Sequence, residues 1–431
     1  MESRIEELYE IYLAHPQIST DSRNIIKDSI FFALHGERFD GNRFAAEALG
    51  QGAAVSVIDD DTAIPDGITP EQRSKYFKVD DTLKALQDLA RLHRRKLGIP
   101  LLAITGTNGK TTTKELLLAV LSQKFRTSAT KGNLNNHIGV PLTLLSLTGD
   151  TEIGIIEMGA SARGEIALLC GIAQPDYGII TNIGRAHLEG FGGPEGIKAA
   201  KGELYDSLCS TGGTAFVRAD DPVLNSMSES RKGLRTIKYD SGLADGIPCN
   251  LAGDYNRYNI AAAAAAGRYF GVDAESIARA IGGYVPTINR SQSISTAHNT
   301  IIADCYNANP SSMQAALEWF GKTPLGELDP AARGKTIILG SMLELGEWSL
   351  TEHSRIIELA INQGFDRIML VGSEFAEALA SLTQTPPPNV KIFGDTEEVK
   401  NFIVGNPYPH RHAILLKGSR KLALEKILEY L

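Results

Sequence analysis

The sequence predicts an α/β protein of three domains, and three observations lead to this prediction. The chain has 431 residues, which is too long for one hydrophobic core and matches about three domains of ordinary size. From residue 101 onward, short apolar strands alternate with helical patterns, which is typical of a mostly parallel sheet. Between the first of these strands and the next helix lies a glycine-containing loop with the features of a phosphate-binding loop.

The first domain is expected to cover residues 1–97. Apolar segments at 30–34 and 53–58 predict strands, and the charge-rich segment 83–97 predicts a helix. Gly98 and Pro100 follow that helix and are expected to end it.

The second and third domains are expected to cover residues 98–292 and 293–431. Predicted strands of the second domain start at Leu101 and continue at 153–156, 177–180 and 214–217, with closing helices at 260–266 and 274–281. The third domain has the pattern of a smaller Rossmann-like unit, with strands at 300–303, 336–339, 367–371 and 413–416. Ligands bind beyond the carboxyl ends of parallel strands, so residues that follow strands are candidates for the site.

Composition excludes several classes of protein. A net charge of −8 argues against broad nucleic-acid binding, so an anionic ligand must be held by local positive groups. No apolar run approaches about 18 residues, and the N-terminus is acidic, which predicts a cytoplasmic protein without a membrane span. The four cysteines are scattered without metal-binding spacing and predict neither zinc nor disulfides: Cys170, Cys209, Cys249 and Cys305.

The phosphate-binding loop is predicted by the run Gly106-Thr107-Asn108-Gly109-Lys110-Thr111-Thr112. Glycines let backbone N–H groups turn toward an anion, and the helix that follows directs its positive end there. Lys110 adds a positive charge, and Thr111 offers a hydroxyl to Mg²⁺. The general motif has glycine at the position of Ile104, so this loop is a shorter variant.

Two residues after later strands are candidates for the metal ion that accompanies ATP. Glu157 closes the strand predicted at 153–156, and His187 lies seven residues beyond Ile180. Their positions in the sequence are also compatible with a purely structural role for each residue. Glu157 could be a solvated strand end, and His187 a hydrogen-bonded loop histidine.

Lys201 falls on the apolar stripe of a predicted helix, together with Ile197, Leu204 and Leu208. A buried ammonium group there is costly, so the side chain must reach solvent, find an anion or lose its charge. The pattern does not choose among these outcomes.

Four polar residues lie where a nucleotide could be contacted. Asn256 and Asn259 precede the alanine-rich helix, and helix capping is the ordinary interpretation of Asn256. Arg290 and Asp304 flank the start of the third domain, from which they could reach a nucleotide on the second domain.

Together these segments resemble the Mur ligases, the ATP-dependent enzymes that build the peptide of peptidoglycan precursors. The shortened loop from Gly106 to Thr112 matches the family's ATP-binding form, and the resemblance implies ATP and Mg²⁺ as cofactors. It implies that Thr111 and Glu157 hold one Mg²⁺, and that His187 and a carbamylated Lys201 hold a second. It also implies that Asn256 and Asn259 lie near the adenine, and that Arg290 and Asp304 reach ATP from the third domain. Lys110, His187, Lys201 and Arg290 would be the catalytic residues.

Four stretches resemble the branch of the family that adds D-alanyl-D-alanine to UDP-N-acetylmuramoyl-tripeptide. They lie at 21–23 with 31–41, at 132–143, at 304–313 and at 417–420. The resemblance implies an N-terminal domain that binds the UDP substrate, and these substrate contacts: Ser22, Arg23, Asn133, Asn135, Asn136, Asn307, Asn309 and Arg420. The tetrapeptide D-N-P-R of the branch that adds the third residue does not occur. Ser341 stands where the family usually has aspartate.

The resemblance implies a monomeric ligase that makes an amide through an acyl phosphate. Two other functions stay open at this point. A ligase similar to folylpolyglutamate synthetase shares the loop variant, but it lacks the uridine-binding domain that Ser22 and Arg23 imply. A P-loop ATPase that works as a switch or transporter would instead use ATP to change conformation.

Overall fold

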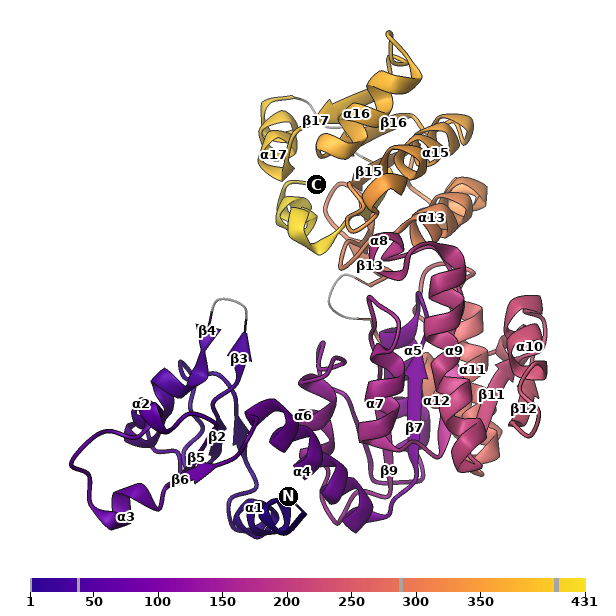
Figure 1. The fold of residues 1–431 in the computed structure, drawn as a ribbon. Helices are drawn as coiled ribbons and strands as arrows, with labels where there is room; N and C mark the ends of the chain where they lie inside the picture. Colours follow the sequence, from indigo (N-terminus) through magenta and orange to yellow (C-terminus); the bar gives the residue numbers. More distant parts are fainter. Residues whose placement is uncertain (1, 37–38, 287–289, 407–410) are drawn as a thin grey trace.

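The computed structural model describes residues 2–36, 39–286, 290–406 and 411–431. It contains three α/β domains, each built on its own sheet (Figure 1). The N-terminal domain lies to one side of the central domain, and the C-terminal domain sits above the central domain next to helix α8 (Figure 1). The predicted fold class is therefore confirmed. None of the described helices combines the length and apolar character that a membrane span requires.

The N-terminal domain has a parallel four-stranded sheet in the order β1-β2-β5-β6. Its strands are β1 (Ile18–Ser19), β2 (Ile30–Phe32), β5 (Val55–Ile58) and β6 (Tyr76–Lys78), and a small hairpin is formed by β3 (His35–Gly36) and β4 (Phe39–Asp40). Its helices are α1 (Glu2–Ala14), α2 (Ala45–Gly50), α3 (Pro70–Arg73) and α4 (Thr82–Leu97). Gly98 ends α4 in the left-handed conformation, with φ of 62°. The resemblance at 31–41 includes residues 37 and 38, which lie outside the described residues.

The central domain has a parallel six-stranded sheet in the order β12-β11-β10-β7-β9-β8. Its strands are β7 (Leu101–Thr105), β8 (Thr127–Ala129), β9 (Ile153–Glu157), β10 (Tyr177–Ile180), β11 (Thr214–Arg218) and β12 (Arg235–Tyr239). Its helices are α5 (Lys110–Leu121), α6 (Gly139–Leu145), α7 (Glu165–Ala173), α8 (Leu188–Phe191), α9 (Pro194–Thr211), α10 (Pro222–Glu229), α11 (Asn256–Tyr269) and α12 (Ala274–Gly283).

Strand β7 is buried on both faces, which explains its continuous apolar sequence. Leu101 and Ala103 pack into the core formed with α4, α6, α7 and α9, while Leu102 and Ile104 pack into the core formed with α5, α11 and α12. The chain reaches β8 and β9 on one side of β7 and then crosses to β10 on the other. This reversal of strand order opens a crevice at the carboxyl ends of β7, β9 and β10.

The C-terminal domain has a six-stranded sheet in the order β13-β14-β18-β15-β16-β17, parallel except for the edge strand β13. Its strands are β13 (Gln292–Ser295), β14 (Thr300–Asp304), β15 (Gly334–Gly340), β16 (Arg367–Val371), β17 (Val390–Phe393) and β18 (His412–Lys417). Its helices are α13 (Pro310–Lys322), α14 (Leu325–Leu328), α15 (Ser349–Asn362), α16 (Ser373–Leu382) and α17 (Thr396–Gly405). One face packs against α13, α15 and α16, and the other against α17 and the C-terminal turns.

Helix α8 joins the central and C-terminal domains. Leu188 and Phe191 belong to the same apolar cluster as Met313 of α13 and Met342 and Leu345 of the loop after β15. This packing holds the carboxyl edge of the central sheet against the C-terminal domain. Residues from both domains consequently surround one cavity.

Candidate active site

The loop after β7 adopts a shape that glycine makes possible. Gly106 has φ of 135°, and a Cβ there would lie 2.1 Å from the Thr181 hydroxyl oxygen. Gly109 has φ of 79°, and a Cβ there would lie 2.4 Å from Asn259 Oδ1. Because Gly109 is the N-cap of α5 and has no side chain to cap it, the first N–H groups of the helix are left for an anion.

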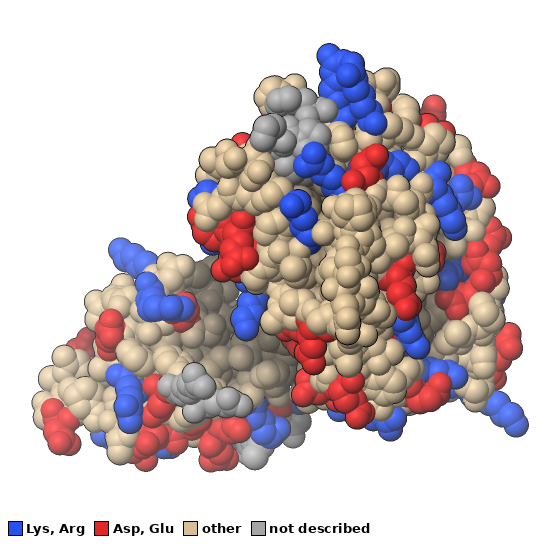
Figure 2. All heavy atoms as spheres, turned by 90° about the horizontal axis from the view of Figure 1, so that it is seen from above, with Lys and Arg blue, Asp and Glu red and all other residues tan. Residues whose placement is uncertain are grey.

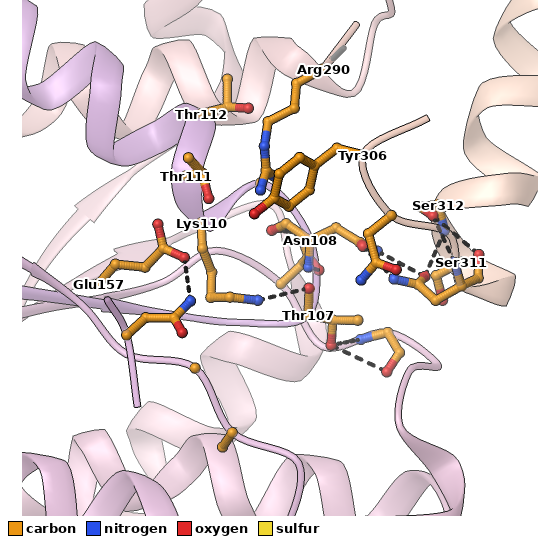
Figure 3. Close-up of a pocket in the computed structure, with 18 of the residues that line it drawn as sticks. Thr107, Asn108, Lys110, Thr111, Thr112, Glu157, Arg290, Tyr306, Ser311 and Ser312 are labelled. Carbon is orange, nitrogen blue, oxygen red and sulfur yellow. Dashed lines mark hydrogen bonds between the residues drawn. The ribbon is translucent and has the colours of Figure 1, made fainter. Parts of the chain in front are cut away.

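Lys110 folds back over this loop. Its Nζ donates to the Thr107 carbonyl oxygen at 3.1 Å (Figure 3) and to the Gly106 carbonyl oxygen at 2.9 Å. Burial lowers the pKa of Lys110, and the positive charge of Arg290 lowers it further, against an opposing effect of Glu157. Two cations and one carboxylate therefore lie close together at the loop. An incoming triphosphate would neutralise both cations.

A cavity of about 840 Å³ lies between the central and C-terminal domains. Most of the residues predicted from the sequence line it: Thr107, Asn108, Gly109, Lys110, Thr111, Thr112, Asn133, Asn135, Asn136, Glu157, His187, Asn256, Asn259, Arg290, Asp304, Asn307 and Asn309. Five predicted residues do not line it: Gly106, Lys201, Ser22, Arg23 and Arg420. Acidic and basic side chains are interspersed on the face of the molecule seen in Figure 2. That face therefore carries no broad basic patch.

Glu157 is buried at the end of β9, with 2% of its surface exposed. The interpretation of this residue as a solvated strand end is therefore wrong. Its Oε1 accepts a hydrogen bond from Asn135 Nδ2 at 2.8 Å, while Oε2 is buried and has no hydrogen-bond partner among the described residues (Figure 3). An unpaired buried carboxylate oxygen is costly, and a divalent cation beside it would remove that cost. Thr111 lines the same cavity.

Within the described part of the chain, no group of three or more His, Cys, Asp or Glu side chains could hold a metal ion. A closed protein cage of the kind used by structural zinc is thus not formed by these residues. Magnesium commonly keeps its waters and takes only one or two carboxylates together with substrate phosphates. The isolated Glu157 carboxylate suits that kind of ion.

His187 lies in the loop after β10 and has φ of 50°. Its Nδ1 donates to the carboxylate of Glu344, a residue of the C-terminal domain that was not singled out from the sequence. Burial lowers the pKa of His187, and the positive charges of Lys110 and Lys201 act in the same direction, although Glu344 opposes them. A neutral imidazole that donates from Nδ1 keeps the lone pair of Nε2 for a metal ion.

Lys201 is buried in α9 with 2% of its surface exposed, so it does not reach solvent. Its Nζ donates to the Ala160 carbonyl oxygen at 3.3 Å and lies 5.0 Å from the centre of the Phe191 ring. Burial, and then the charge of Lys110, lower the pKa of Lys201 to about 7. Of the three outcomes open from the sequence, loss of charge is the one that this environment favours.

The asparagines have structural contacts in addition to their place in the cavity. Asn259 donates from Nδ2 to Asn256 Oδ1 at 2.8 Å, and Asn256 donates to the Ala252 carbonyl at 2.7 Å. The prediction that Asn256 caps its helix is wrong, because Tyr255 is the N-cap of α11 and Asn256 is its first helical residue. Asn136 accepts from the backbone N–H groups of Ile138 and Gly139 at the start of α6.

Asn108 and Asn309 join the phosphate-binding loop to the C-terminal domain. Asn309 Nδ2 donates to Asn108 Oδ1 at 2.7 Å, and Asn108 Nδ2 donates to Asn309 Oδ1 at 3.4 Å. Asn309 is also the N-cap of α13, where it forms a capping box with Ser312.

Asp304 ends β14 on the cavity side and pairs with Lys417 at the end of β18. The Lys417 Nζ donates to Asp304 Oδ2 at 2.6 Å, and the Ser291 N–H donates to Oδ1 at 3.3 Å. Parallel pairing of β14 with β18 places Asp304 opposite Lys417. The acid predicted to contact ATP is therefore held by a buried cation of its own domain.

Three predicted substrate contacts, and the serine that replaces the family aspartate, lie outside the cavity. Ser22 is buried, and Arg23 is an exposed side chain that donates to the Asp21 carboxylate, which lowers the pKa of Asp21 to about 2. Arg420 is exposed and donates to the Tyr306 hydroxyl at 3.3 Å. Ser341 is buried, donates to the Val371 carbonyl at 3.2 Å and accepts from the Ser419 hydroxyl at 2.6 Å through its own carbonyl.

Three family models match successive parts of the chain. Residues 16–94 match the Mur ligase family catalytic domain, residues 104–246 the Mur ligase middle domain, and residues 289–420 the Mur ligase glutamate ligase domain. The UDP-N-acetylmuramoyl-tripeptide--D-alanyl-D-alanine ligase of Bacillus subtilis is 35% identical, with 99% of this chain and 96% of that protein covered.

Solved structures agree with the family models. The crystal structure of MurF from Acinetobacter baumannii matches with a TM-score of 0.82 and 31% identity, covering 96% of this chain and 92% of that one. MurF ligase from Thermotoga maritima in complex with ADP matches with a TM-score of 0.80 and 26% identity, covering 97% of each chain. This chain belongs to the Mur ligase family.

Proposed function

We propose that this chain adds D-alanyl-D-alanine to UDP-N-acetylmuramoyl-tripeptide with consumption of ATP, the reaction in the name of its curated relatives. The observation that carries the proposal is the composition of one cavity. It contains the phosphate-binding loop, the buried Glu157 carboxylate, and the residues Asn307 and Asn309 of the C-terminal domain. A simple ATPase needs the loop, whereas a ligase also needs a second domain that brings an acceptor to the same place.

The reaction requires two anions, a carboxylate and a triphosphate, to approach each other. The terminal carboxylate of the tripeptide attacks the γ-phosphorus of ATP, and ADP leaves with the electrons of the broken P–O bond. The unprotonated amine of D-alanyl-D-alanine then attacks the acyl carbon, the C–O bond to phosphate breaks so that inorganic phosphate leaves, and the amine nitrogen loses a proton as the amide forms. Lys110 and Arg290 lie close together, since the charge of Arg290 helps to lower the pKa of Lys110. Their two positive charges would offset the repulsion between the two anions.

Magnesium would be held by Thr111 and Glu157 at one position and by His187 with a carbamylated Lys201 at another. The bound ion would neutralise phosphate charge. Glu157 supplies the unpaired buried oxygen described above, and His187 is oriented through Nδ1 by Glu344. Glu344 is thus a support that the C-terminal domain contributes to the metal site.

Carbamylation of Lys201 is supported by its environment. A lysine with a pKa near 7 is partly unprotonated at neutral pH, and the free amine is the form that adds carbon dioxide. The product is an anion, which the positive charges of Lys110 and a metal ion would stabilise. The side chain would then act as an oxygen ligand rather than as a cation.

Phosphate release, measured with each substrate omitted in turn, tests the proposed function. The ligase predicts release that depends on ATP, UDP-N-acetylmuramoyl-tripeptide and D-alanyl-D-alanine together, with formation of the pentapeptide product. Release with ATP alone would favour an ATPase switch. Activity that requires a folate and glutamate instead would favour the folylpolyglutamate alternative. The cytoplasmic location and the monomeric state stay predictions from the sequence.

A further inference from the structure

Tyr306 lies two residues beyond the end of β14 and lines the cavity. Two guanidinium groups approach its ring. The Arg290 guanidinium carbon lies 3.8 Å from the ring centre, and that of Arg420 lies 5.2 Å from it. The Tyr306 hydroxyl also accepts a hydrogen bond from Arg420 at 3.3 Å. Figure 3 shows the Tyr306 ring beside the Arg290 side chain, above the phosphate-binding loop.

The two arginines come from separate segments of the chain. Arg290 precedes β13, whereas Arg420 follows β18 at the start of a short 3-10 helix. Two like charges at one place repel each other, and each arginine side chain loses considerable rotamer freedom when it is fixed. An aromatic ring offsets both costs, because its negative face attracts a guanidinium within about 6 Å of its centre.

The position of Arg290 connects this cluster to the phosphate-binding loop. Arg290 lines the same cavity as Lys110 and Thr111 of that loop, so its guanidinium faces the same ligand space. Arg420 is exposed and does not line the cavity, but its guanidinium contacts Tyr306, which does. Tyr306 thus stands between a cation near the nucleotide loop and a cation at the outer side of the C-terminal domain.

We propose that Tyr306 is a positioning residue that fixes Arg290 for the triphosphate and Arg420 for the carboxylate of the dipeptide. The ring keeps the two cations at a set separation before either substrate arrives. Each arginine then binds its anion with less loss of side-chain entropy. This inference rests on the proposed function, because that function supplies the two anions.

Two substitutions distinguish the contribution of the Tyr306 ring from that of its hydroxyl group. Tyr306→Leu removes the aromatic face, and we expect the KM values for ATP and for D-alanyl-D-alanine to rise about 5- to 30-fold, as expected for loss of a cation–π contact of about 1 to 2 kcal/mol. The KM for UDP-N-acetylmuramoyl-tripeptide is expected to change less than about twofold. Tyr306→Phe keeps the ring, so the KM for ATP is expected to return to the wild-type value, while the KM for the dipeptide stays about threefold raised.

Tyr430→Leu is the matched control. Tyr430 belongs to the same domain and has the Lys400 Nζ 5.3 Å from its ring centre, but it does not line the cavity. We expect all three KM values of this variant to match those of the wild type. Thermal unfolding of each variant, with and without ADP, shows whether the fold and nucleotide binding survive.

The outcomes distinguish this inference from the proposed function. If wild-type protein forms the pentapeptide and Tyr306→Leu leaves both KM values unchanged, or raises all three equally, the positioning role is wrong and the ligase function stands. Failure of Tyr306→Phe to restore the KM for ATP would also overturn the role of the ring. If wild-type protein forms no amide with these substrates, the proposed function itself fails.

Discussion

The two junctions between domains differ in whether their buried polar groups have partners. At the junction of the N-terminal and central domains, buried polar side chains bond to backbone carbonyls. The Tyr12 hydroxyl donates to the Leu145 carbonyl at 2.7 Å, and His93 Nε2 donates to the Leu147 carbonyl at 2.9 Å. These groups lie in an apolar cluster that continues from one domain into the other. The contacts are satisfied without any ligand.

The junction of the central and C-terminal domains also has an apolar part, around α8, but its polar part is incomplete. It contains the cavity, the unpaired Glu157 oxygen and the buried Lys201 amine. His187 and Glu344, which meet across this junction, both have positive φ. Strained residues and unpaired polar groups persist where a ligand completes the site. The comparison indicates that the first junction stabilises the molecule, whereas the second leaves polar groups that a ligand could complete.

The largest effect is expected from Lys201→Ala, which removes the predicted carbamate. Activity is expected to fall roughly 10²- to 10³-fold, because an electrostatic group that contacts the reacting phosphates through a metal ion is lost. Added short-chain carboxylates are expected to restore part of it by supplying the missing anion. Steady-state phosphate release, measured over a series of acetate concentrations, checks this.

Lys198→Ala serves as the control for that series. Lys198 lies on the same helix, is partly exposed and does not line the cavity. It is expected to retain wild-type activity. Full activity of Lys201→Ala without carboxylate, or no recovery at any concentration, would contradict the carbamate role.

Tyr12→Phe tests the first junction. The Leu145 carbonyl loses its donor in a buried place, so the free energy of unfolding is expected to fall by about 1 to 3 kcal/mol. The value of kcat/KM is expected to stay within about twofold of wild type, since the cavity lies at the other junction. Urea unfolding together with activity measurements tests both parts. Equal loss of stability in Tyr258→Phe, where a half-exposed ring loses its hydroxyl, would show that the effect is not specific to this junction.

Asn309→Ser gives a smaller effect at the second junction. Serine caps a helix about as well as asparagine, so the free energy of unfolding is expected to change by less than about 0.5 kcal/mol. The paired amides of Asn108 and Asn309 are lost, and kcat/KM is expected to fall about fivefold. Asn309→Ala should in addition lose about 1 kcal/mol of stability with the cap. If Asn309→Ser has wild-type activity, the hydrogen bonds between Asn108 and Asn309 do not contribute to catalysis.

Much of the fold could be predicted from the sequence because buried parallel strands carry continuous apolar runs. The predicted strands at 177–180 and 367–371 have the bounds of β10 and β16. Short or polar edge strands have no such signal, and β8 and β13 were not predicted. The helix of Asn256 starts one residue earlier than a capping role for Asn256 would require, because the backbone already turns at Gly253.

The site could be predicted where its signal is local. The phosphate-binding loop lies within one short segment, and Lys201 was singled out by its apolar neighbours on one helix. The contact of His187 with Glu344 joins residues 157 positions apart, and that of Asn108 with Asn309 spans 201 positions. The periodicity of a sequence indicates local structure and cannot predict contacts between residues so far apart. Tyr306 lay inside a stretch that the resemblance had marked, but only the positions of the two arginines show what its ring contacts.

Isotope transfer can show whether the enzyme passes the γ-phosphate of ATP to the carboxylate of the tripeptide. The tripeptide substrate is prepared with both oxygens of its terminal carboxylate labelled with ¹⁸O and is incubated with the enzyme, ATP and D-alanyl-D-alanine. If the carboxylate attacks the γ-phosphorus, each released inorganic phosphate carries one ¹⁸O atom and the new amide carries the other, as measured by mass spectrometry. Release of unlabelled phosphate together with the pentapeptide product would show that no acyl phosphate forms.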